Sequence, residues 1–255
     1  MEVKSGVLYI GKNAGAYILR DLQAATRSIK IISPYLSLEK VKVLMEKAAK
    51  GINVTLIASS DIGQGKKGAD NIFRELIQQH CHTDQQKKKR REIGFYFMIA
   101  SYVILSLCLF GFMYLQQWKL IKYLIPFIPV IISAHILLKN MRLYTYTYSP
   151  RSDIRLSFPI SYQSAEKDRQ KDYPAHECFL THVKLYVIDD EIAYLGSINF
   201  TSPGFRYNYE SRIKITDRAV ICKLIEEINY LHSNEEIHRM SLDKIGKSLW
   251  LEPIN

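Results

Sequence analysis

The residues best suited to chemistry lie in two short segments of the chain near residue 190. Residues 181–189 are rich in β-branched and apolar side chains, which predicts a strand. Side chains two apart share one face of a strand, so His182 and Lys184 point the same way. The same spacing relates Ser197 to Asn199 if that segment is also extended. We therefore expect an imidazole, an ammonium, a hydroxyl and an amide to converge on one pocket.

Each of these groups has a use in cleaving a phosphodiester. An imidazole can attack phosphorus to form a covalent phosphoenzyme, which divides one displacement into two easier ones. Lys184 and Asn199 can hold the non-bridging oxygens, where charge builds up in the transition state, and Ser197 is a further phosphate-binding candidate. Glu210, in a predicted neighbouring strand, can bind the second imidazole nitrogen and fix its tautomer. These residues predict chemistry that needs neither a metal nor a cofactor.

The predicted strand also has a core face and an end. Val183, Leu185 and Val187 alternate with the polar residues and are expected to pack in the core. A turn at residues 189–191 should send residues 192–195 back beside the strand. Asp189 stands at this turn, where it is better placed to fix the turn or neighbouring donors than to touch substrate.

One spaced pattern resembles the HKD signature of the phospholipase D superfamily: His182-x-Lys184, then Asp189 after four residues, then Gly196-Ser197-x-Asn199 after six more. The later Asn208-x-Glu210 is similar to the family element whose carboxylate orients the histidine. The resemblance covers roughly residues 1–80 and 142–235. It implies a mixed β-sheet flanked by helices in an α/β/α sandwich, and a metal-independent phosphodiesterase with a phosphohistidine intermediate. The catalytic residues that it implies are His182, Lys184, Asp189 and Glu210.

The signature occurs once in this chain, whereas the family needs two at one active site. The other histidines that we compared lack a lysine two positions later: His80, His135, His176, His232 and His238. One copy per chain predicts a homodimer with a shared site, because a two-fold axis through the site brings the two copies of His182 together.

The remainder of the chain alternates helices with strands. Helices are predicted over residues 14–25, 38–48, 217–232 and 242–249, and strands over 29–33, 54–59 and 144–148. We interpret the polar residues 150–175 as a loop. The predicted organisation is an N-terminal half of the phospholipase D-like domain (1–84), an inserted transmembrane hairpin (93–138), and a C-terminal half that carries the motif (141–255).

The inserted hairpin is predicted from two apolar runs. Residues 95–115 carry no charge and span about 32 Å as a helix, which matches a hydrocarbon core of about 30 Å. The second run, 120–138, contains Lys122, Pro126 and Pro129, so it is either a tilted, kinked span or a segment that dips into the bilayer and returns. A buried helical pair in a soluble domain is the alternative.

Basic residues gather around this insertion. Residues 85–142 hold nine basic residues and one acid, for a net charge of +8, and everything else sums to +2 of the formal +10. Seven of the nine flank the outer ends of the hairpin and two lie in its tip, so the positive-inside tendency predicts cytoplasmic termini and a multi-pass membrane protein. The basic run 87–91 can also contact anionic headgroups. Four cysteines without paired spacing fit a reducing compartment.

The sequence leaves the substrate open. A hairpin that holds the site near headgroups favours a membrane-anchored phospholipid hydrolase, with the bilayer and a second copy of the chain as partners. A membrane-tethered endonuclease acting on DNA or RNA is the alternative, and a catalytically idle adaptor is disfavoured because the motif positions are filled.

Overall fold

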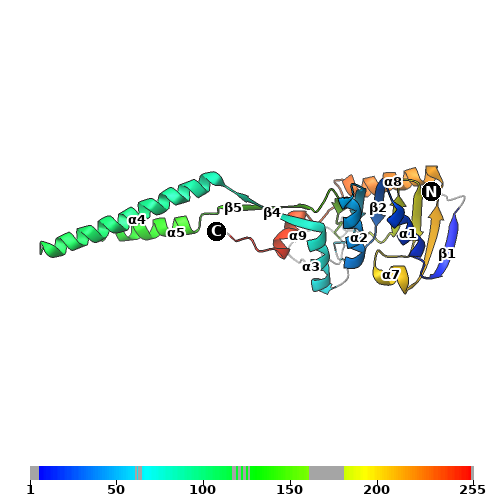
Figure 1. The fold of residues 1–255 in the computed structure, drawn as a ribbon, viewed down its shortest axis with the longest axis horizontal. Helices are drawn as coiled ribbons and strands as arrows, with labels where there is room; N and C mark the ends of the chain where they lie inside the picture. Colours follow the sequence, from blue (N-terminus) through cyan, green and yellow to red (C-terminus); the bar gives the residue numbers. More distant parts are fainter. Residues whose placement is uncertain are drawn as a thin grey trace. The chain divides into compact units, whose positions relative to one another are not determined.

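The computed structural model describes residues 6–60, 62, 65–116, 119, 122, 125, 127–160 and 181–253. The chain forms two compact units. The first, which we call the sheet domain, comprises Met1–Gln78 and Tyr148–Trp250. The second, which we call the hairpin unit, comprises Gln79–Thr147 and Leu251–Asn255. Figure 1 shows the elements of both.

The sheet domain is built on a seven-stranded mixed sheet. Its strands are, in spatial order, β1 (Val7–Lys12), β9 (Tyr209–Ile215), β8 (Ile192–Gly196), β7 (Leu185–Ile188), β2 (Ser28–Ile32), β3 (Asn53–Ile57) and β6 (Arg155–Ser157). β2, β3 and β6 are parallel to one another, and the remaining pairs are antiparallel.

Helices cover both faces of this sheet. The helix α8 (Arg218–Ser233) packs its apolar stripe on one face, in a cluster that contains Val187 and Ala193. Neighbouring residues of a strand point to opposite faces, and Tyr194 donates from its hydroxyl to the Asp21 carboxylate in α1 (Ala16–Ala24) at 2.5 Å. α1 therefore covers the other face, together with α2 (Leu38–Ala49). The predicted mixed sheet flanked by helices is confirmed.

Most predicted elements appear within a few residues of their expected bounds, but the structure also contains elements that were not predicted. β1 lies at the sheet edge with most of its residues exposed, so its apolar residues show no alternation that marks a strand. The helices α3 (Gly65–Leu76) and α7 (Ser202–Arg206) were not predicted, whereas α9 (Leu242–Leu249) has its predicted bounds. The predicted loop over 150–175 contains β6, and its residues 161–175 lie outside the described residues, as does His176.

The strand predicted over 181–189 is shorter than expected. β7 begins at Leu185, which is the first of its residues to pair with both neighbouring strands, opposite Ile32 and Leu195. Val183 lies before the paired region and is 44% exposed, so its predicted core position is wrong. The turn after β7 is as expected: Asp189 and Asp190 have φ of 53° and 58°, the left-handed values that a type I′ hairpin turn requires.

The hairpin unit consists mainly of two helices. α4 (Gln85–Tyr114) begins at the Asp84 cap, whose carboxylate accepts from the Lys87 N–H at 3.0 Å, so the helix includes the basic run that was expected to precede it. α5 (Phe127–Lys139) is shorter than the predicted second run, with Pro129 in its first turn, where proline is tolerated. Residues 117, 118, 120, 121, 123, 124 and 126 lie outside the described residues. A separate two-stranded sheet pairs β4 (Ile77–Thr83) with β5 (Tyr144–Pro150).

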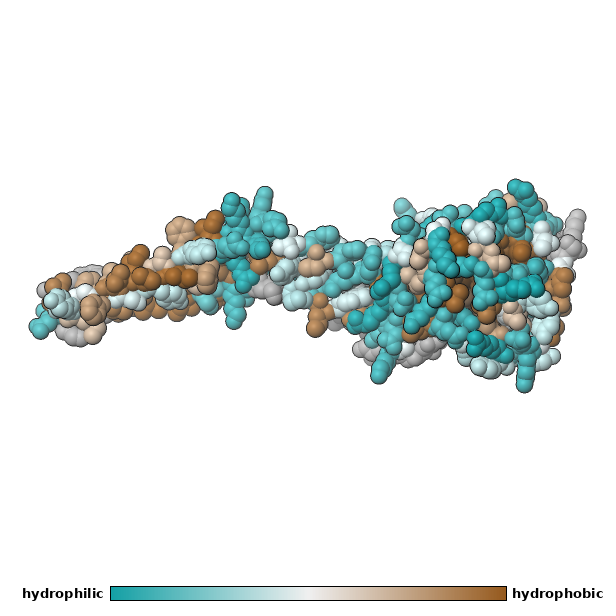
Figure 2. Space-filling view, viewed as in Figure 1, coloured by the Kyte–Doolittle hydropathy of each residue, from teal (hydrophilic) through white to brown (hydrophobic). Residues whose placement is uncertain are grey.

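The two helices pack against each other through a close approach at Gly94. A Cβ at this position would lie 2.6 Å from Leu138 Cδ2, so a larger residue would require the Leu138 side chain to shift. In neither helix is any described residue buried, and Figure 2 shows hydrophobic surface along both. Among the described residues, α4 is the one helix long and apolar enough to cross a bilayer, and α5 is a shorter apolar helix.

Candidate active site

The sheet topology brings four strand ends together. β7 and β8 form a hairpin, so the start of β7 lies beside the end of β8. β9 runs antiparallel to β8, and the Ser197 N–H donates to the Ser211 carbonyl at 3.0 Å. The end of β2 lies on the other side of β7, where Ile32 pairs with Leu185. Residues that flank these four ends therefore meet at one end of the sheet.

His182 and Lys184 come together just before β7. The Lys184 ammonium lies 2.9 Å from Nδ1 and 3.2 Å from Nε2 of His182, and it donates to the His182 carbonyl at 2.7 Å. His182 is exposed, whereas Lys184 is buried. Burial lowers the pKa of Lys184, and the nearby Glu210 carboxylate partly opposes that shift. The predicted pairing of imidazole and ammonium is thus present, with the ring open to a substrate.

Glu210 lies near the start of β9, with its carboxylate buried. It accepts hydrogen bonds from the Ser197 hydroxyl and, at 3.1 Å, from Asn208 Nδ2. The Ser197 oxygen accepts in turn from the Ser211 N–H at 3.0 Å. Among the residues that the structure describes, Lys184 is the one whose polar side chain contacts the His182 ring. The structure therefore does not show the predicted hydrogen bond from the His182 ring to Glu210; the carboxylate accepts from Ser197 and Asn208 instead.

Asn199 lies in the loop after β8, and side chains outside the motif hold this loop. The Tyr186 hydroxyl donates to the Ile198 carbonyl at 2.7 Å, and the Phe200 N–H donates to Ser33 Oγ at 2.8 Å. The pKa of Tyr186 is raised well above its ordinary value by burial, and further by Glu210. Tyr186 follows Lys184 by two positions. Side chains two apart share a face of a strand, so this spacing could have predicted that Tyr186 lies on the same face as Lys184.

Two buried polar atoms in this region have no hydrogen-bond partner among the described residues: Thr181 Oγ1 and Asn199 Oδ1. Buried polar groups are ordinarily hydrogen-bonded. A substrate bound at this end of the sheet can supply the missing partners, since a hydroxyl both donates and accepts and an amide can rotate to present its NH₂. Asn199 was predicted from the sequence, whereas Thr181 was not.

Asp189 lies at the opposite end of the β7–β8 hairpin. Four residues of extended chain lie between it and Lys184, which places the two about 16 Å apart. Its carboxylate accepts from the backbone N–H groups of Thr26, Arg27 and Ser28 at 3.0, 2.7 and 2.9 Å. The catalytic assignment of Asp189 is therefore corrected to a positioning one, in agreement with its expected action on the turn and neighbouring donors. Burial raises the pKa of Asp189, but the three N–H groups outweigh this effect and lower it.

A further charged cluster surrounds the start of α2, next to the end of β2. Glu39 accepts from the Ser202 hydroxyl at 2.6 Å and pairs with Arg206 at 3.4 Å. Lys40 is 1% exposed, with its ammonium 3.6 Å from Glu39 and 5.0 Å from the Phe205 ring centroid. Burial lowers the pKa of Lys40, Glu39 raises it and Arg206 lowers it further. The Arg206 guanidinium, a group that can bind phosphate, pairs with Glu39 in this structure.

The chain is similar to known proteins in its C-terminal half and in its fold. The family model described as "Cardiolipin synthase, PLD-like domain" matches residues 139–232. No curated protein matches the chain. Among solved structures, the chain is similar to NucT from Helicobacter pylori, with 14% identity, a TM-score of 0.46, and coverage of 89% of this chain and 94% of that chain.

Two other solved structures are similar at comparable levels. One is Nuc from Salmonella typhimurium, described as a phospholipase D family member, with 12% identity, a TM-score of 0.46, and coverage of 92% of this chain and 99% of that chain. The other is the phosphatidylserine synthase of Haemophilus influenzae Rd KW20, with 13% identity and a TM-score of 0.41. This chain, matched over 97% of its length, spans 41% of that synthase.

Proposed function

We propose that this chain, identified as a phospholipase D superfamily member by the match of residues 139–232 to a PLD-like domain, is a metal-independent phosphodiesterase that hydrolyses phospholipids, with His182 as the nucleophile. The single observation that carries this proposal is the juxtaposition of an exposed imidazole with a buried ammonium 2.9 Å from its Nδ1. An ammonium beside a nucleophile can bind the non-bridging oxygens of a phosphodiester as it is attacked.

The proposed reaction has two displacements. In the first, a ring nitrogen of His182 forms a bond to phosphorus while the bond from phosphorus to the leaving alcohol breaks, and a general acid protonates that alcohol. In the second, water attacks phosphorus, gives up a proton to the same acid–base group, and releases His182. Lys184 and Asn199 hold the non-bridging oxygens in both steps. Ser197 and Glu210 act beside them, with Ser197 linking the carboxylate to the loop that carries Asn199.

The general acid is proposed to be a second copy of His182. The chain carries one such signature, and the His182 ring is exposed at an end of the sheet. A two-fold axis passing near this ring would bring two imidazoles to one phosphorus, one as nucleophile and one as acid. We therefore propose a homodimer with one shared site.

We further propose that α4 and α5 insert into a bilayer as a hairpin, with the sheet domain in the cytoplasm. Support comes from the unburied apolar surface of α4, where Phe110 is 69% and Leu107 64% exposed. Monomeric soluble proteins rarely expose continuous apolar surface of this extent. The basic residues at the start of α4 and the end of α5 favour placing those ends on the cytoplasmic side.

A direct comparison of substrates tests the proposal. The full chain is purified in detergent without divalent ions and offered labelled anionic phospholipid and labelled single-stranded DNA in parallel, with His182→Asn as the control. Headgroup release that the substitution abolishes is the expected result. Cleavage of DNA alone, abolished by the same substitution, would replace lipid hydrolysis with the nuclease alternative, and activity that His182→Asn retains would refute the proposed mechanism.

A further inference from the structure

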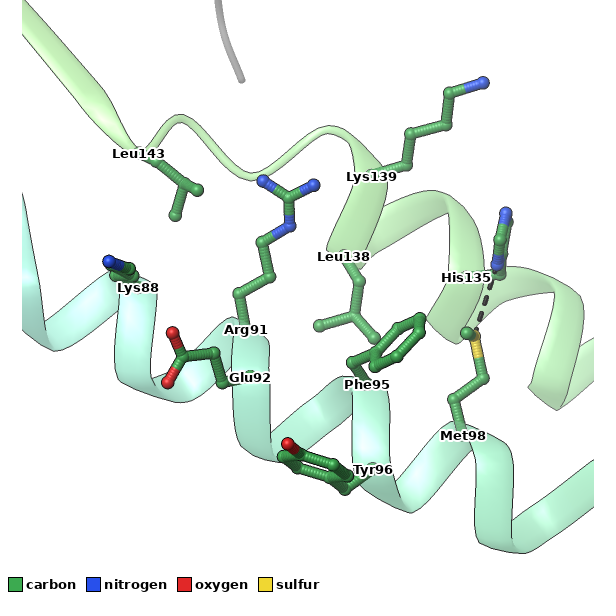
Figure 3. Close-up of a pocket in the computed structure, with 10 residues that line it drawn as sticks. All are labelled: Lys88, Arg91, Glu92, Phe95, Tyr96, Met98, His135, Leu138, Lys139 and Leu143. Carbon is green, nitrogen blue, oxygen red and sulfur yellow. Dashed lines mark hydrogen bonds between the residues drawn. The ribbon is translucent and has the colours of Figure 1, made fainter.

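The hairpin unit contains a pocket between α4 and α5 that lies outside the proposed active site. Its volume is about 520 Å³, and it opens where α4 begins and α5 ends (Figure 3). Three basic side chains line it, Lys88 and Arg91 from α4 and Lys139 from the last turn of α5. Phe95 and Leu138 form an apolar wall beside them. The pocket therefore joins a cationic rim to an apolar interior.

Two residues of the basic run 87–91, Lys88 and Arg91, line the pocket. Lys88, Arg91 and Phe95 follow one another at spacings of three and four, which places them on one face of α4. Lys89 and Arg90 lie about 100° and 200° further round the helix from Lys88, and they do not line the pocket. Arg91 is partly buried, and Lys88, Lys89 and Arg90 are exposed. The run thus has a pocket face and an outer face.

A second, apolar pocket lies on the other side of the contact between α4 and α5. Its volume is about 350 Å³, and it shares Met98 and Leu138 with the first pocket. Its other lining residues are mainly small or aliphatic, among them Val130 and Ala134 from α5. Gly94 faces Leu138, and the His135 ring lies 3.2 Å from Met98 Sδ, so the helices run antiparallel. These two contacts separate the apolar pocket from the basic one.

We infer that the first pocket binds one anionic phospholipid, with its phosphate between Lys88, Arg91 and Lys139 and its acyl chains along the apolar wall that Phe95 and Leu138 form. The inference rests on the proposed insertion of α4 and α5 into a bilayer. Basic pockets at the cytoplasmic ends of membrane helices suit lipid headgroups of this charge. The basic rim lies next to Phe95, where the uncharged part of α4 begins, which is the level at which headgroup phosphates lie in the proposed orientation.

Glu92 gives the pocket a preference among anionic headgroups. Its carboxylate lines the same pocket and lies beside Arg91 in Figure 3, so the rim carries three positive charges and one negative charge. A carboxylate disfavours a second phosphate but can accept hydrogen bonds from hydroxyl groups. A headgroup with one phosphodiester and a polyol, as in phosphatidylglycerol, fits this combination.

The test is a titration of the full chain in neutral detergent with fluorescent phosphatidylglycerol, and with phosphatidylcholine of the same acyl chains. All chains carry His182→Asn, so that lipid binding is measured without turnover. The double substitution Lys88→Gln with Arg91→Gln is compared with Lys89→Gln with Arg90→Gln, which removes the same charge from the outer face. Lys139→Gln tests the rim from the other helix.

The expected result is at least tenfold weaker binding of phosphatidylglycerol by the pocket-face double variant, a loss in the same direction for Lys139→Gln, and binding within about twofold of the parent for the outer-face variant. If the basic run acted only through its charge, both double variants would lose affinity alike, by a factor of about five per residue removed. Equal losses in the two, or binding of phosphatidylcholine as tight as that of phosphatidylglycerol, would overturn the inference.

Two further arms separate the alternatives. Soluble glycerol 1-phosphate is expected not to displace the lipid at millimolar concentration, and displacement would show a phosphate site without a lipid component. Extraction of the parent chain from membranes by alkaline carbonate would refute the proposed insertion, on which the inference rests. The catalytic proposal can fail in its own assay without changing any of these results.

Discussion

Replacing Asp189 should separate the stability of the sheet domain from its chemistry. The carboxylate accepts from three backbone N–H groups of residues 26–28, and Ser28, one of these residues, is buried. A hydrogen bond from a buried donor to a charged acceptor contributes about 1.5 to 3 kcal/mol, and exposed ones contribute less. We therefore expect Asp189→Ala to lower the free energy of unfolding by about 3 kcal/mol, to which its positive φ adds strain for alanine.

The assay is thermal unfolding of the full chain in detergent, followed by tryptophan fluorescence. Trp250 reports on the sheet domain, since its ring lies 5.8 Å from that of Tyr148. A loss of about 3 kcal/mol lowers the Tm by about 6 to 12 °C for a domain of this size. Asp189→Asn is the matched control, because asparagine tolerates the left-handed conformation and keeps one acceptor oxygen, so its loss should be about half.

The contribution of Asp189 to the free energy of unfolding should decrease as the pH falls. The pKa of Asp189 is lowered from 3.8 in the folded protein, so its contribution is present above about pH 4 and is lost as the pH falls through the folded pKa. The gap in Tm between the parent and Asp189→Asn should therefore close in acid. At temperatures below unfolding, turnover by Asp189→Asn should stay within a few-fold of the parent. Abolished turnover with an unchanged Tm would refute the positioning role and restore Asp189 to the catalytic set.

The remaining predictions concern the other end of the sheet. Lys184→Met should lower kcat by at least 100-fold with the Tm unchanged or raised, because it removes a buried charge; a lowered Tm with near-normal kcat would contradict this. Ser197→Ala should lower kcat several-fold through the loss of its hydrogen bond to Glu210, with recovery in Ser197→Thr, and no recovery would count against that link. Lys40→Met should raise the free energy of unfolding at pH 7 by about 1 kcal/mol, because it removes a buried charge. The gain should shrink toward pH 10.5 as the buried lysine of the parent loses its proton, and a gain independent of pH would show that the charge is not its cause. Mixing inactive His182→Asn chains with the parent should lower activity per parent chain if the site is shared, whereas linear dilution would argue for independent sites.

The sequence predicts the positions of the reactive side chains because these depend on short-range spacing. His182 and Lys184 are two residues apart and lie together, although the strand that was expected to align them begins only at Leu185. The turn at Asp189 was predictable because aspartates tolerate positive φ, which a tight hairpin turn demands.

Partners fixed by tertiary structure were not predictable in the same way. Glu210 was expected to bind His182, but it binds Ser197, a neighbour created by the pairing of β8 with β9. Asp189 finds its donors in residues 26–28, more than 160 positions away in the chain, through the pairing of β2 with β7. The same pairing places Ser33 against the loop that carries Asn199. Such contacts follow from strand order, which local patterns do not specify.

The central claim is that the imidazole at position 182 forms a bond to phosphorus during turnover. Quenching the enzyme at steady state with ³²P-labelled substrate, digesting it under alkaline conditions and mapping the label tests this claim most directly. We expect label on the peptide that contains His182, stable to alkali and lost in acid, and none in His182→Asn. Label on another residue, or full turnover with no trapped intermediate at any time point, would contradict it.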